Sequence, residues 1–489
     1  MISKQKHTGC ATCDHGAEVD TKKLVTLSAA PAKPRRKKEA EAEGDYTPAY
    51  RFPFLLGVYL ATNAIRDCYT VVDGPDCLFF KIEFVHGKHD INSTLLQVNG
   101  RHRVVVSHTT CENITVTKGE RVRNSIIAAD ANPDAGVVMV TSLPMVTIIG
   151  TQYDQIIREL EAQTAADVFE VPGRSLNGDW YLGYEDVLKA LADNIDVSGL
   201  ERSANKVAII GNFHDRNEQD ALGNLRELER MFAGIGLDLC ATWLSGQSYR
   251  ELAAAGEADT LIAFPLGREA AKRLARRTGA KVVEVETPFG LGRTQKMIRA
   301  VADHLDIRDR ADAFIDAELA KIVPRLEWIV PHHFLGRKVA FSGAPELLGG
   351  FLQLSLELGM EVVHLSSPTI EPVWIDDLSE EFGALPPLFF DVSEMVLGKE
   401  LKRVRNEGVD LLIGNSDVLK RWGVGIPNLE FGFPSVYHHA FHDRPHLGFA
   451  GYTCFVQRMM DAMLAGRSMP QATRRRDWSP DGDARLASK

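Results

Sequence analysis

The chain has 489 residues, of which 45% are hydrophobic and 25% charged, so its composition is that of a soluble globular protein with about three domains. Its net charge of −10 argues against nucleic acid or an anionic membrane as a partner. No apolar run reaches the roughly 18 residues that a membrane-spanning helix needs, and no signal peptide is recognisable. The cytoplasm is therefore the expected location.

Residues 1–48 combine mixed charges and prolines with few large apolar residues, a composition typical of a flexible arm. The arm contains Cys10-Ala-Thr-Cys13, whose spacing suits one metal ion or two irons of a cluster. The alternative is a tail with two inert thiols. Residues 467–489 are predicted to form a second, shorter tail.

Between these arms, short apolar runs that end in Gly, Ser, Asn or Pro alternate with helical stretches. This alternation predicts an α/β fold of three similar Rossmann-like domains, each a parallel sheet flanked by helices. The predicted domains are residues 49–200, 201–330 and 331–466. The predicted strands are 68–72, 103–107, 137–141 and 168–171, then 206–212, 236–243, 259–264 and 280–287, then 337–343, 360–366, 409–415 and 429–434.

The most informative thiol is Cys77, which ends the turn Asp73-Gly-Pro-Asp-Cys77 directly after an apolar strand. Open α/β sheets bind ligands at the carboxyl ends of their strands, and a cysteine there can reach a metal cluster held at that edge. Ser142 follows another apolar run in the same way. Cys68 is a further candidate ligand, with a buried core cysteine as the alternative.

Other sequence motifs are less informative about function. Neither G-x-x-x-x-G-K-[ST] nor G-x-G-x-x-G after a strand is present, so any ATP would be bound by another protein. The odd number of cysteines, seven, does not indicate a disulfide framework. Four histidines cluster near the carboxyl end with a spacing that suits a metal, or else belong to a histidine-rich segment without one. These are His438, His439, His442 and His446.

Four segments, in the same order along the chain, resemble motifs of the nitrogenase component 1 family. They are residues 73–77, 111–119, 141–154 and 431–452. The resemblance covers roughly residues 50–465 and is strongest to the β-type subunit. Where the family usually has further cysteines, this chain has none near residues 51–54 and has a serine at Ser142. Phe264 stands at the approximate place where α-type subunits hold their active-site cofactor by a cysteine, so this chain is not expected to hold that cofactor.

The resemblance implies an oxidoreductase subunit that is catalytic only with its partner chain. An α-type subunit would pair with it, and two pairs would form a heterotetramer. An iron–sulfur cluster, 4Fe–4S or larger, would lie at the shared interface, with Cys77 as a ligand and Ser142 beside it. An ATP-dependent iron–sulfur reductase would dock there and supply electrons for a small-molecule substrate. The alternative is a non-catalytic scaffold on which a metallocluster is assembled.

Overall fold

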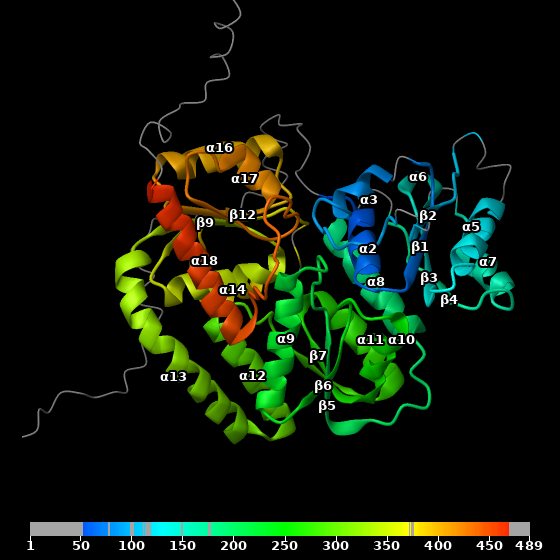
Figure 1. The fold of residues 1–489 in the computed structure, drawn as a ribbon, viewed down its shortest axis with the longest axis horizontal. Coiled ribbons are helices and arrows are strands. Elements are labelled where there is room, and N and C mark those ends of the chain that lie inside the picture. Colours follow the sequence, from blue (N-terminus) through cyan, green and yellow to red (C-terminus); the bar gives the residue numbers. More distant parts are fainter. Residues whose placement is uncertain are drawn as a thin grey trace, which may run out of the picture.

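The computed structural model describes residues 52–76, 79–97, 102–110, 112, 119–147, 150–174, 178–370, 372 and 376–468. Three parallel sheets, of four, four and five strands, are each flanked by helices. In Figure 1 the first sheet lies at the right, the second below the centre and the third at the upper left. The predicted fold class is therefore confirmed.

The first sheet has the strand order β2-β1-β3-β4, with every pairing parallel. All six residues of β1 are buried, because helices cover both faces of a parallel sheet and favour continuous apolar strands over alternating ones. The strands are β1 (Cys68–Asp73), β2 (Val104–Val106), β3 (Val137–Ser142) and β4 (Asp167–Glu170). The helices are α2 (Phe54–Asn63), α3 (Phe79–Val85), α5 (Glu120–Asp130), α6 (Pro144–Thr147), α7 (Tyr153–Leu160) and α8 (Trp180–Asn194).

The second sheet has the order β6-β5-β7-β8 and is again parallel throughout. Helix α8 packs against both α2 and α11, so it joins the first and second sheets. The strands are β5 (Ser203–Ile210), β6 (Asp238–Thr242), β7 (Ala258–Ala263) and β8 (Lys281–Glu284). The helices are α9 (Gln219–Gly234), α10 (Tyr249–Leu252), α11 (Arg268–Thr278), α12 (Leu291–Leu305) and α13 (Arg308–His333), with short 3₁₀ turns at Ala253–Glu257 and Pro265–Gly267.

The third sheet has the order β11-β10-β9-β12-β13. It contains one strand, β11, that the sequence pattern did not predict. The strands are β9 (Lys338–Ser342), β10 (Glu361–Ser367), β11 (Leu388–Phe390), β12 (Leu411–Gly414) and β13 (Asn428–Glu430). The helices are α14 (Pro345–Glu357), α15 (Asp376–Phe382), α16 (Glu394–Asn406), α17 (Ser416–Trp422) and α18 (Gly448–Ser468). Helix α18 packs against β13 and also against α9, and so links the third sheet to the second (Figure 1).

Each sheet has a switch point, where the chain turns from one side of a central strand to the other. The central strands are β1, β5 and β9, whose neighbours on the two sides are β2 and β3, β6 and β7, and β10 and β12. In open α/β sheets, ligands bind at the carboxyl edge beside such points. The fold therefore offers three candidate edges. Of the described helices, none combines the length and apolar character that crossing a bilayer requires.

Candidate functional site

The switch point of the first sheet brings Asp73 and Ser142 together. They end β1 and β3, are paired in the parallel register, and are both 2% exposed. The chain turns sharply after Asp73, at a glycine that leaves no room for a side chain: a Cβ on Gly74 would lie 2.6 Å from a methyl carbon of Leu143. This turn leads to Cys77, which itself lies outside the described residues.

A buried hydrogen-bond network holds the base of the turn. Tyr153 Oη donates to Asp73 Oδ2 at 2.8 Å, and Ser107 Oγ donates to Asp73 Oδ1 at 2.6 Å. The amide of Gly74 donates to Ser107 Oγ at 3.0 Å. Burial and the Asp73 charge raise the pKa of Tyr153, so its hydroxyl remains a proton donor. The network therefore fixes where the chain starts towards Cys77.

Replacing Asp73 with alanine should destabilise the protein by about 2–4 kcal/mol, because two buried hydroxyl donors would lose their acceptor. The change should appear as a lower midpoint of urea unfolding. The matched control is Asp76→Ala, since that carboxylate is largely exposed and contacts His108 at the surface. Equal stability of the two variants would mean that the network does not hold the turn.

Cys68 lies apart from Asp73 and Ser142. It begins β1, at the opposite end of the strand, and is fully buried. Burial raises the pKa of its thiol to about 12, so it is not a thiolate at neutral pH. The structure thus favours the alternative of a core cysteine and does not bring Cys68 to the candidate cluster site. Cys10, Cys13 and Cys111 lie outside the described residues.

The histidine cluster joins segments that are far apart in the sequence. His438 Nδ1 lies 2.7 Å from Glu430 Oε2, and His439 Nδ1 lies 2.7 Å from Glu218 Oε1. His446 lies beside Asn224 on α9. Within the part of the chain that the structure describes, no three His, Cys, Asp or Glu side chains are placed to hold a metal ion. These contacts tie the histidine-rich segment to β13 and to the start of α9.

Three large apolar side chains, those of Phe80, Ile91 and Phe441, are exposed. Their exposed fractions are 71%, 45% and 82%. Glu218 connects two of them, because it accepts hydrogen bonds from the amides of Ile91 and of Ala440, the neighbour of Phe441. Lys88 lies over the ring of Phe80. Phe80 and the exposed Asp76 flank Cys77 in the sequence.

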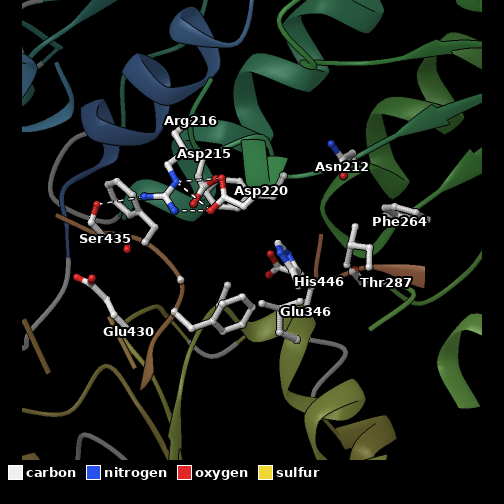
Figure 2. A pocket seen from close by; sticks show the side chains of 18 of the residues that line it. Asn212, Asp215, Arg216, Asp220, Phe264, Thr287, Glu346, Glu430, Ser435 and His446 are labelled. Carbon is white, nitrogen blue, oxygen red and sulfur yellow. Dashed lines mark hydrogen bonds and ion pairs between the residues drawn. The ribbon is translucent and has the colours of Figure 1, made fainter. Parts of the chain in front are cut away.

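A cavity of about 50 Å³ lies between the carboxyl edges of the second and third sheets (Figure 2). Phe264 lines this cavity and is 1% exposed. Its aromatic ring carries no atom that could ligate a metal. The sequence pattern drew attention to Phe264 and His446 but not to the charged residues around them. Those residues are Asp215, Arg216, Asp220, Glu346, Glu430 and Arg458.

Fold and site together define a three-sheet α/β protein whose polar residues gather at strand-end switch points. The family model described as nitrogenase component 1 type oxidoreductase matches residues 54–464. The chain belongs to this family.

Two relatives illustrate the level of similarity. The nitrogenase molybdenum-iron protein beta chain of Acidithiobacillus ferridurans is 26% identical over 352 residues, which span 64% of this chain and 65% of that one, less than two thirds of its length. The corresponding beta chain of Azotobacter vinelandii is 23% identical over 428 residues, covering 78% and 79% of the two chains.

The solved structure described as nitrogenase Cp1 at pH 6.5 is similar in fold, with a TM-score of 0.74 over 91% of this chain and 97% of that chain. The identity is 17%, so this likeness supports the three-sheet architecture alone.

Proposed function

We propose that this chain is the β-type subunit of a nitrogenase-like reductase complex. It would take electrons from an ATP-dependent iron–sulfur reductase, through an iron–sulfur cluster at the interface with an α-type subunit, to reduce a small-molecule substrate. The observation that carries this proposal is the family match over residues 54–464 together with relatives that are beta chains. The free thiols of Cys68, Cys240 and Cys454 are in keeping with a reducing compartment such as the cytoplasm.

Cys77 is the residue that we propose as the cluster ligand of this chain, and the surrounding residues fit that role. Asp76 and Phe80 flank it and are both exposed, so a ligand between them is within reach of a second chain. An iron–sulfur cluster supplies single-electron transfer at a potential tuned by hydrogen bonds and burial. The buried network around Asp73 would hold the turn, while Ser142 stays in the wall behind it.

One thiolate is fewer than a cluster needs. Iron–sulfur clusters are commonly held by four cysteines, so the partner chain would have to supply most of the remaining ligands. Cys10 and Cys13 are the other ligands that we propose from this chain, contributed by the amino-terminal arm. Sharing a cluster in this way requires a stable interface, and such interfaces bury upwards of about 2,000 Å².

The exposed apolar side chains of Phe80, Ile91 and Phe441 form the patch that we propose as the docking surface for the α-type partner. Phe80 is three residues from Cys77 in the sequence, and large exposed aromatic side chains at the centre of an interface contribute much of its binding free energy. The test is anaerobic co-expression with the α-type chain, followed by size-exclusion chromatography and iron analysis. We expect a heterotetramer that contains iron. A stable, active monomer would contradict the proposal.

Phe441→Ser should weaken binding of the partner by about ten-fold or more, because truncating a central aromatic anchor typically costs over 1 kcal/mol. Its side chain is 82% exposed, so folding of the isolated chain should be unaffected. Trp328→Ser is the matched control, since Trp328 is 68% exposed on α13, which Figure 1 places on the opposite side of the molecule from α3. Equal loss of affinity in both variants would exclude the patch as the docking surface.

A further inference from the structure

The cavity between the second and third sheets lies where two switch points face each other. Its walls come from the residues that follow β5 and β7 on one side, and from those that follow β9 and β13 on the other. Figure 2 shows Arg216, His446 and Glu346 around one open space, contributed by segments far apart in the sequence. Carboxyl edges beside switch points are where open α/β sheets bind ligands, so the position alone marks a candidate site.

Arg458 contributes a positive charge to the lining of this cavity. Its guanidinium donates to the carbonyl oxygen of Glu430 at 3.1 Å and stacks over the rings of Phe431 and Phe455. Among the described residues it takes part in no ion pair. By contrast Arg216, the other arginine of the lining, is paired with Asp220.

The surroundings of Arg458 add further positive charge. Burial, and next the neighbouring Arg444, lower the pKa of Arg458 to about 10. The Nε atom of Arg444 is buried and has no hydrogen-bond partner among the described residues. His446 has a pKa lowered to about 4, first by burial and also by Arg458, Arg216 and Arg444. Burial therefore keeps this imidazole neutral, supported by the three arginines and opposed by the nearby carboxylate of Asp220.

Two acidic residues of the lining are ionised, Asp220, which is paired with Arg216, and Glu430. Glu430 is engaged by the hydroxyl of Ser416 and by His438. Burial raises the pKa values of Asp215 and Glu346 to about 7, which favours the protonated form of each carboxyl. Glu346 is 8% exposed, and within the described part of the chain no group lies at hydrogen-bond distance and angle from its Oε2 atom. When protonated, this group can donate a hydrogen bond to a negatively charged oxygen.

The size of the cavity limits its occupant. At about 10–15 Å³ for one water-sized probe, a cavity of about 50 Å³ holds roughly four waters. We propose that this cavity binds a small oxyanion, either inorganic phosphate or a short carboxylate, with Arg458 as its charge partner. The inference goes beyond the proposed function and does not depend on it, because every residue of the cavity lies in the second or third sheet region.

The test is isothermal titration of the full chain, purified with its co-expressed partner, with phosphate and with acetate at constant ionic strength. Saturable binding of phosphate identifies the inorganic source, and saturable binding of acetate identifies the carboxylate. Arg458→Gln should weaken binding of the favoured anion by about ten-fold or more, because charge-assisted hydrogen bonds would be lost. Arg250→Gln, which removes an equal charge at an exposed position of α10, should leave the affinity unchanged.

Two results would overturn the proposal. One is the absence of saturable binding of either anion to the unaltered protein, which needs no variant. The other is an affinity for the favoured anion that is equal in the Arg458→Gln and Arg250→Gln proteins. If Arg458→Gln does not fold, Arg458→Lys takes its place, because it retains the charge but presents no planar pair of donors. Its affinity for the favoured anion should be lower than that of the unaltered protein, and an equal affinity would contradict the proposal.

Discussion

Replacing Cys77 with alanine should remove most of the iron and visible absorbance from the anaerobically purified complex, while the chain remains folded. Cys77 follows Asp73-Gly-Pro-Asp in the sequence, and Asp73 lies at the switch point of the first sheet. A cluster that loses a ligand at an interface becomes labile. The cost to folding should be small, because the network around Asp73 holds the turn without Cys77. Iron analysis and electron paramagnetic resonance measure the loss.

Two further variants sharpen this experiment. Cys240→Ala is the matched control: its thiol donates to the carbonyl oxygens of Val207 and Ala254, so its loss should leave the iron content unchanged. The double variant Cys10→Ala/Cys13→Ala tests the arm, and a reduced iron content would support ligation by these thiols. Unchanged iron and an unchanged spectrum in Cys77→Ala would exclude Cys77 as a ligand.

The fold could be predicted because its strands carry local signals. The central strands are buried runs of β-branched and other apolar residues that end in small or polar ones, and each lies between helical stretches. Strand β11 was missed for a physical reason. It has three residues, directly after Pro386-Pro387, and gains its place by pairing with β10 at the sheet edge.

The candidate site could be predicted in part. The adjacency of Asp73 and Ser142 follows from parallel strands that end at one edge, which a sequence pattern can indicate. The oxyanion cavity could not be predicted, since Arg216 and Arg458 meet there from two different sheets. The role of the histidines was also hidden, because Glu218 is 221 positions away from its partner His439. Such contacts depend on how the sheets pack, about which local periodicity carries no information.

Replacing Glu218 with alanine should destabilise the protein by about 3–5 kcal/mol, the effect typical of breaking a buried charged network. Glu218 is fully buried, and its carboxylate accepts from the amide of Ala440 at 2.9 Å and lies 2.7 Å from Nδ1 of His439. It also accepts from the amide of Ile91 at 3.4 Å and lies 3.8 Å from the guanidinium of Arg216. One side chain thus joins the regions of all three sheets.

The loss should be visible as a lower unfolding temperature and as faster amide hydrogen exchange at Ile91 and Ala440, whose amides would lose their acceptor. Glu218→Gln keeps the shape and one acceptor oxygen, so its loss of stability should be smaller than that of alanine. Glu229→Ala removes the same charge from an exposed position on the same helix and should change stability by no more than about 0.5 kcal/mol. If Glu218→Ala were as stable as Glu229→Ala, the contacts of Glu218 would not contribute to holding the three sheet regions together.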